Sequence, residues 1–187
     1  MRLLSLDMTK YGAFLRGINL ARQRRISSAG LKSVFEDMEF EDVSTFRTSG
    51  NVIFAADRAP LASLTARIEK ALAKFAGFEV VVFLRTESEV RTIARHRPFP
   101  RKLADSMGKL QVLMLSSKPT AAKQKKVLGL ATDRDRLAFG VRELYWLPTA
   151  GTQGSALDLA AIEKLLGSTT MRTKGTIEQL AAKYFDD

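Results

Sequence analysis

The sequence predicts an α+β protein in which two halves repeat one order of strands and helices. Three observations predict this class. Short apolar and aromatic runs alternate with segments whose apolar residues recur at helical spacing. Glycine, proline and serine separate these segments, as they do in turns and helix caps. The first half has the order β-α-β-β-α-β and the second half β-α-β-β-α, which is typical of two ferredoxin-like units in tandem.

The first half begins with an expected strand over residues 11–16 and a helix that Ser27 or Ser28 caps at its N-terminus. Strands over residues 43–48 and 51–56 follow, joined by a tight Ser-Gly-Asn turn. The apolar stripe of the helix consists of Leu31, Val34, Phe35 and Met38. Its spacing predicts that one helix face packs on the strands.

A second helix is expected between Pro60, near its first turn, and Gly77, just past its end. Its apolar stripe consists of Leu61, Leu64, Ile68, Leu72 and Phe75. Residues 78–84 are nearly all apolar, which favours a strand in the centre of the sheet. Thr86-Glu-Ser-Glu89 is a capping-box pattern and predicts a short additional helix.

The second half contains the same signals in the same order. Strands are expected over 110–115, 135–140 and 143–147, with a helix over 120–128. Ser155 is the expected cap of a further helix that ends at Gly167, and an extra C-terminal helix follows the polar residues 168–176. The expected organisation is an N-terminal extension over 1–8, a first half over 9–96, a linker over 97–108 and a second half over 109–187.

Charge is the unusual feature of the composition. The chain has 30 Lys and Arg against 20 Asp and Glu, a net charge of +10, which favours an anionic small molecule or nucleic acid as partner. Non-specific binding of polyanions is the alternative. The absence of cysteine excludes disulfides, cysteine nucleophiles and thiolate metal sites, and the single histidine, His96, excludes a zinc site built on several histidines. No metal is therefore expected.

Nothing in the sequence indicates a membrane or export segment. No apolar run approaches the ~20 residues that a membrane-spanning helix needs. Residues 1–7 are too short, and too soon interrupted by Asp7, for a signal peptide. A cytoplasmic location without membrane association is therefore expected.

Polar residues gather where two of the expected strands end. Arg16-Gly17-Ile18-Asn19 follows the first strand, and Thr48-Ser49-Gly50-Asn51 joins the second and third strands. In a split βαβ unit the first two strands are parallel, so these loops are expected at the same edge of the sheet. A guanidinium, amides, hydroxyls and backbone N–H groups suit a phosphate or carboxylate.

Structural interpretations remain open for each of these loops. Ser-Gly-Asn is also ordinary hairpin chemistry, and Arg16 could instead pair with Glu41 or Asp42. The polar residues 168–176 contain Arg172 and Lys174 before an expected helix N-terminus, which indicates either a second anion site or simple capping by Thr173 or Thr176. The basic clusters at 22–25 and 123–126 are typical of solvated faces.

Several stretches of the chain resemble the bacterial DUF1697 proteins, a family without an established function. They are Leu15-Arg-Gly-Ile-Asn19, Ser49-Gly-Asn-Val-Ile-Phe54, Arg97-Pro-Phe99, Tyr145-Trp-Leu-Pro148 with Gly154-Ser155, and Thr170-Met-Arg172 with Thr176. The resemblance implies two ferredoxin-like halves. Because family members usually begin just before the first strand, it also implies that residues 1–7 are an extension and that Met8 is the natural start. The chain departs from the family's Thr-x-Arg-Asn-Trp-Asn-Thr motif at Thr173, Lys174 and Gly175, and it has Ala156 where lysine is frequent.

Three hypotheses about function follow. The first is binding of a phosphorylated small molecule or a nucleic-acid backbone. Its proposed contacts are Arg16, Gly17, Asn19, Ser49, Gly50 and Asn51, with Arg172 as a further one. The second is an enzyme acting on a phosphorylated or nucleotide-like substrate, although spacing assembles no nucleophile–base pair and indicates no cofactor or catalytic residue. The third is a module for self-association or protein docking.

Overall fold

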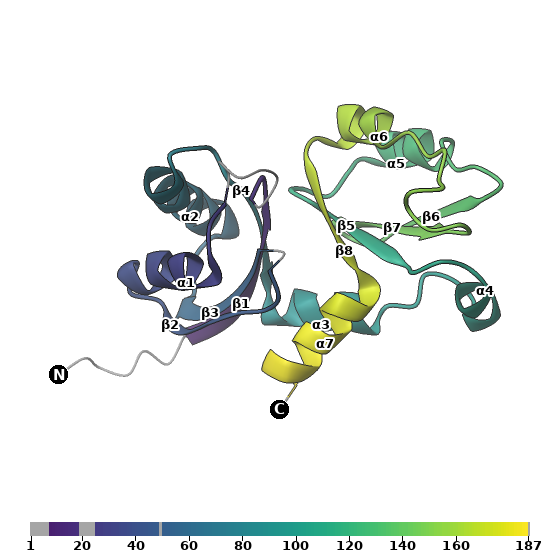
Figure 1. Cartoon of the computed structure of the whole chain (residues 1–187). Helices are drawn as coiled ribbons and strands as arrows, with labels where there is room; N and C mark the ends of the chain where they lie inside the picture. Colours follow the sequence, from purple (N-terminus) through teal and green to yellow (C-terminus); the bar gives the residue numbers. More distant parts are fainter. Residues whose placement is uncertain (1–7, 19–24, 49, 187) are drawn as a thin grey trace. The chain divides into compact units, whose positions relative to one another are not determined.

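The structure is a computed structural model that describes residues 8–18, 25–48 and 50–186 (Figure 1). The chain divides into two compact units, one made of Met1–Arg91 with Lys183–Asp187 and the other of Thr92–Ala182. We call them unit 1 and unit 2. No helix in the described part of the chain has the length and apolar character needed to span a membrane.

Unit 1 contains a four-stranded sheet in which every neighbouring pair is antiparallel. Its strands are β1 (Met8–Arg16), β2 (Glu41–Thr45), β3 (Asn51–Asp57) and β4 (Val81–Thr86). Its helices are α1 (Ser28–Asp37), α2 (Leu61–Ala76) and α3 (Glu87–Arg95), of which the last continues into unit 2. The order β2-β3-β1-β4 confirms the ferredoxin-like arrangement, with β1 and β2 parallel on either side of β3.

The core of unit 1 lies between the sheet and helices α1 and α2, which cover the same face (Figure 1). Alternate residues of β1, such as Tyr11 and Leu15, point into this core because strand side chains alternate between faces. Phe54 of β3 is its centre: its ring stacks on Phe40 and Tyr11 at centroid distances of 4.6 and 5.4 Å and meets the edge of Phe35 at 5.2 Å. Each such pair adds about 0.5–1.5 kcal/mol to the burial energy.

Two expectations for unit 1 were wrong. Strand β4 is an edge strand rather than a central one, and the N–H of Val82 at its outer side donates to Oε1 of Glu69 at 2.9 Å. Its apolar run is explained by burial of both faces, with Phe83 as well as Leu84 inside the protein. Phe75, the last residue of the α2 stripe, is 56% exposed and lies beside Gly30 of α1 instead of in the core.

Unit 2 has a second four-stranded sheet of the same topology. Its strands are β5 (Gln111–Leu115), β6 (Asp135–Phe139), β7 (Glu143–Pro148) and β8 (Thr169–Thr173), in the order β6-β7-β5-β8 with antiparallel neighbours. Its helices are α4 (Arg101–Ser106), α5 (Ala121–Leu128), α6 (Leu159–Leu166) and α7 (Lys174–Tyr184). Helix α4 occupies much of the expected linker at 97–108, and α7 is the expected C-terminal helix, which continues into unit 1.

Most of the polar segment 168–176 forms strand β8, which the sequence analysis did not predict, and the first turn of α7. In both units the fourth strand leads directly into a helix whose first turn a threonine caps. Thr86 Oγ1 accepts a hydrogen bond from the N–H of Glu89, and Thr173 Oγ1 accepts one from the N–H of Thr176. The sequence predicted the first of these helices from its capping box, and α7 is its counterpart in unit 2.

In both units a glutamate from a helix also covers the edge strand of the sheet. In unit 1, Glu69 of α2 accepts the hydrogen bond from Val82 on the edge strand β4. In unit 2, Glu163 of α6 accepts from the N–H of Thr169 on the edge strand β8 at 3.1 Å. An exposed row of strand N–H groups invites pairing with other chains, and a carboxylate at the edge prevents this.

Gly50 provides a test of how closely the β2–β3 turn packs on β1. Its φ is +72°, and a Cβ at this position would lie 2.5 Å from Cδ1 of Ile18. Gly77 has a similar φ of +75° but no atom near a Cβ. We expect Gly50→Ala to lower the free energy of unfolding by about 2–5 kcal/mol, because the left-handed backbone and the overpacking both cost energy.

Gly77→Ala is the matched control, with an expected loss of only about 1–2 kcal/mol from the backbone conformation. Urea unfolding followed by circular dichroism measures both variants. Equal losses in the two variants would show that the Ile18 contact does not restrict residue 50.

Candidate functional site

The loops at the ends of β1 and of the β2–β3 hairpin lie together, as expected from the topology. The N–H of Leu15 donates to the carbonyl oxygen of Gly50 at 2.8 Å, and Ile18 packs on Gly50. Gly17 and Gly50 have φ values of +86° and +72°, so each provides a backbone conformation that other residues rarely adopt. Asn19 and Ser49, the other expected members, lie outside the described residues.

Two further expected residues have defined places in this region. Arg16 is half-buried at the end of β1, opposite Val81 of β4. The Asn51 side chain is only 1% exposed, and its Nδ2 donates to the carbonyl oxygen of Phe46 at 2.9 Å. The N–H of Phe46 in turn donates to Asn51 O at 3.0 Å, so Asn51 closes the hairpin.

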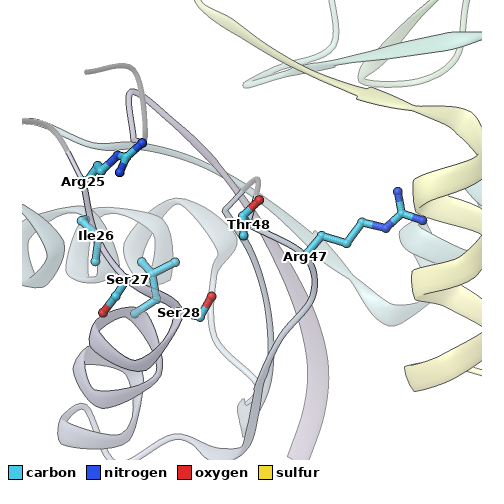
Figure 2. A pocket seen from close by; sticks show the side chains of 7 residues that line it. Arg25, Ile26, Ser27, Ser28, Arg47 and Thr48 are labelled. Atoms are coloured by element: carbon cyan, nitrogen blue, oxygen red, sulfur yellow. The ribbon is translucent and has the colours of Figure 1, made fainter. Parts of the chain in front are cut away.

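A cavity of about 470 Å³ opens beside these loops, at the N-terminus of α1 (Figure 2). Its described lining is Arg25, Ile26, Ser27, Ser28, Leu31, Arg47 and Thr48. Ser27 is the N-cap of α1, and its Oγ accepts a hydrogen bond from the N–H of Gly30 at 3.0 Å. The cavity is located here because α1 starts at the same sheet edge at which β1 ends.

The cavity lies between a cationic side chain and the N-terminus of a helix. The first N–H groups of a helix have no partner within the helix and carry the positive end of its dipole. The first turn of α1 contains no acidic residue. In Figure 2, Arg25 and Thr48 lie on two sides of the cavity, whereas the side chain of Arg47 extends away from them. The guanidinium carbon of Arg47 lies 5.4 Å from the ring centroid of Phe46.

Arg25 is the residue that the sequence analysis did not select. It belongs to the basic cluster at 22–25, for which we favoured a solvated face. Its position two residues before the Ser27 cap was the available signal, because a cation next to a helix N-terminus adds to the positive potential there. A basic cluster alone does not show which way its side chains point.

Arg172 is described within unit 2, in strand β8. It is 7% exposed, and its Nη1 donates to Thr170 Oγ1 and to the carbonyl oxygen of Met171, both at 2.9 Å. Burial lowers the pKa of Arg172 to about 10. Arg85 has the equivalent place in unit 1: it is buried in the fourth strand, and its Nη1 donates to the carbonyl oxygen of the preceding Leu84. This repetition indicates a structural role for both arginines.

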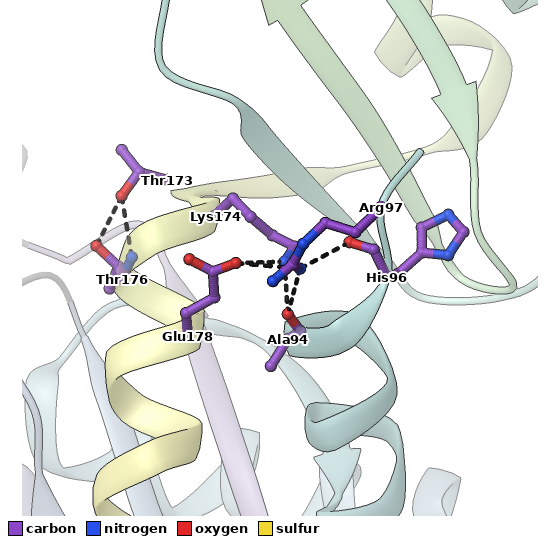
Figure 3. A network of polar contacts seen from close by, with 7 residues as sticks. All are labelled: Ala94, His96, Arg97, Thr173, Lys174, Thr176 and Glu178. Atoms are coloured by element: carbon purple, nitrogen blue, oxygen red, sulfur yellow. Dashed lines mark hydrogen bonds and ion pairs between the residues drawn. The ribbon is translucent and has the colours of Figure 1, made fainter. Parts of the chain in front are cut away.

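Lys174 is part of a polar network at the start of α7 (Figure 3). Its Nζ donates to the carbonyl oxygen of Ala94 at 2.6 Å and to Glu178 Oε1 at 2.8 Å. Arg97 joins the same two partners, at 2.8 Å from Ala94 O and 3.2 Å from Glu178 Oε1. Burial lowers the pKa of Lys174, although Glu178 opposes the shift. The Lys174 ammonium therefore provides a hydrogen-bond donor for a carbonyl oxygen at the C-terminal end of α3. Capping by Thr173 accounts for the start of α7.

Asp135 is the centre of a buried network in unit 2. Its carboxylate accepts hydrogen bonds from Thr132 Oγ1 at 2.6 Å and from Trp146 Nε1 and Ser155 Oγ, both at 2.7 Å. Burial by itself raises the pKa of Asp135, but these three hydrogen bonds outweigh it and hold the pKa below its usual value. Ser155 is therefore not the helix cap that the sequence predicted, and Asp158 caps α6 by accepting from the N–H of Ala161.

Within the described residues, no three or more histidine, aspartate or glutamate side chains gather closely enough to hold a metal ion.

The sequence model of the DUF1697 family, which is described as a protein of unknown function, matches residues 8–145. The chain belongs to this family. A conserved bacterial protein from Streptococcus pneumoniae has a similar solved structure, with a TM-score of 0.76 and 18% sequence identity over 96% of this chain and 100% of that one. At this identity the likeness shows the fold alone. No curated protein matches the chain.

Two of the stretches that resemble DUF1697 proteins meet in the Asp135 network. Trp146 comes from Tyr145-Trp-Leu-Pro148, and Ser155 comes from Gly154-Ser155. In this DUF1697 protein the Trp146 and Ser155 side chains donate hydrogen bonds to Asp135, and these bonds fix strand β7 and the segment before α6 in place. This role is structural.

Asp135→Asn tests the network. We expect a loss of about 2–4 kcal/mol in the free energy of unfolding at neutral pH, because an amide cannot accept from all three donors. The pKa of Asp135 is lowered in the folded state, so its stabilisation is present above the unfolded value of about 3.9 and is lost as the pH falls through the folded value.

The measurement is urea unfolding at several pH values, followed by the fluorescence of Trp146, the single tryptophan. The difference in stability between the wild type and the variant should shrink below a pH of about 4. A difference independent of pH would contradict the lowered pKa.

Proposed function

We propose that unit 1 binds a phosphorylated small molecule in the cavity at the N-terminus of α1. The observation that carries the proposal is a cavity of about 470 Å³ that combines a helix N-terminus with Arg25. Small-molecule sites commonly have volumes of about 300–1,000 Å³. A cavity of this size favours a compact phosphorylated ligand over a nucleic-acid chain at this place.

The groups around the cavity supply complementary chemistry for a phosphate. Arg25 offers a bidentate cation, and the hydroxyl groups of Ser28 and Thr48 offer hydrogen-bond donors. The backbone N–H groups of the first α1 turn are the remaining donors. Arg16, at the same edge of the sheet, is the proposed second cation, with Gly17 and Gly50 shaping the loops.

The proposed activity of this cavity is binding without catalysis. Among the described lining residues none is histidine, aspartate or glutamate, the usual general acids and bases. Asn19 and Ser49 stay predicted contacts, whereas the buried place of Asn51 supports a role in shaping the turn. The cytoplasmic location and self-association expected from the sequence also stay predictions.

Arg25→Ala is the direct test. Isothermal titration calorimetry with pyrophosphate, nucleoside phosphates and sugar phosphates at fixed ionic strength should identify a ligand of the wild type. We expect the variant to bind it about 10- to 100-fold more weakly, because hydrogen bonds to charged groups contribute about 1.5–3 kcal/mol.

The matched control is Arg58→Ala, which removes an exposed arginine of unit 1 outside the described cavity lining and changes the net charge equally. This control should bind like the wild type. Equal weakening in both variants would show that overall charge, and not the cavity, causes the effect. Unchanged affinity in a folded Arg25→Ala variant would contradict the proposed site.

A further inference from the structure

The positive charge of the chain is concentrated in unit 2. Residues 92–182 contain 15 Lys and Arg but only 7 Asp and Glu, a net charge of +8. The remaining residues, which form unit 1, contain 15 basic and 13 acidic residues and have a net charge of +2. The two sets together give the +10 of the chain. The cavity proposed above therefore belongs to the less charged unit, and the excess charge needs a separate explanation.

Helix α5 and the strand that follows it carry a group of exposed cations. Lys123, Lys125 and Lys126 are exposed on α5, which contains no acidic residue. Arg134 is exposed in the turn before β6. Arg136 is exposed on the sheet face opposite to α5, because its neighbour Leu137 packs in the same core as Val127 of α5. We call the three lysines of α5 the α5 basic face.

Acidic residues do little to neutralise this face. Asp133 is exposed in the turn before β6, and Asp135 is buried in its network of three hydrogen bonds. Asp133 is therefore the one exposed carboxylate between the end of α5 and the end of β6. Against the three lysines of α5 it leaves a net positive charge.

The fold itself does not require these lysines. Helix α1 of unit 1 has the same place in the topology as α5, after the first strand and before the second. It contains one lysine and two acidic residues, and Lys32 lies 3.6 Å from Glu36 in an exposed ion pair. An equivalent helix can thus be balanced in charge, so the composition of α5 is a property of unit 2 and not of the architecture.

We propose that the α5 basic face binds the phosphodiester backbone of a nucleic acid. Exposed lysines attract phosphates without reading bases, and clustering on one face is the electrostatic signature of such binding. Lysine is depleted in protein–protein interfaces, which makes a protein partner a poorer match. The buried Val127 holds the apolar side of α5 in the core of unit 2, so the helix has no apolar face with which to enter a lipid surface.

Salt dependence makes the proposal quantitative. Each phosphate neutralised on duplex DNA contributes about 0.9 to the slope of log K against log salt concentration, and about 0.7 on a single strand. The variant Lys123→Gln, Lys125→Gln, Lys126→Gln should reduce the slope by about 2–3 if each lysine meets one phosphate. Its affinity at low salt should fall at least about tenfold.

The experiment uses fluorescence anisotropy of the full chain with three labelled probes: a short duplex DNA, a single-stranded RNA and a poly-glutamate of matched charge. The control variant is Lys32→Gln, Lys70→Gln, Lys74→Gln, which removes the same charge from exposed lysines on α1 and α2 of unit 1. Thermal unfolding by circular dichroism confirms that both variants are folded.

The expected result is salt-dependent binding of DNA or RNA that the α5 variant weakens and the control variant leaves within about twofold of the wild type. The probe that binds more tightly identifies the form of nucleic acid. Equal losses in the two variants, absence of nucleic-acid binding at low salt, or equally tight binding of poly-glutamate would each overturn the proposal.

Discussion

The architecture of unit 1 depends on the antiparallel pairing of β1 with β3, which ends where the N–H of Leu15 meets the carbonyl oxygen of Gly50. At that point the β2–β3 turn comes so close to the end of β1 that Ile18 occupies the space of a side chain at residue 50. The contact places two loops and the N-terminus of α1 at one edge of the sheet. The cavity beside Arg25 exists because of this convergence.

The two units share a topology but differ in what their polar groups do. Both have a buried arginine in the fourth strand, a glutamate on the second helix that accepts from the edge strand, and a threonine cap on the helix that follows. Unit 2 adds the carboxylate network of Asp135, and its surface carries most of the excess positive charge.

The predictions succeeded where a signal was local and failed where it depended on distant partners. The capping box at Thr86 and Glu89 and the glycine after α2 involve only neighbouring residues, and both are present in the structure. Strand β8 was missed because its threonines and Arg172 are polar, and only pairing with β5 buries them. Ser155 was assigned to a cap because the sequence does not show that Asp135, twenty residues earlier, lies within reach.

By itself the sequence determined the order of the elements in the first half, the family and the excess of positive charge, because periodicity, turn residues and composition are properties of short segments or of the whole chain. Only the tertiary structure decided that Arg25 borders a cavity, that Asn51 closes a hairpin and that Lys174 satisfies the end of α3. These roles depend on contacts between residues that are far apart in the chain. Strand pairing and burial determine which of these residues come into contact.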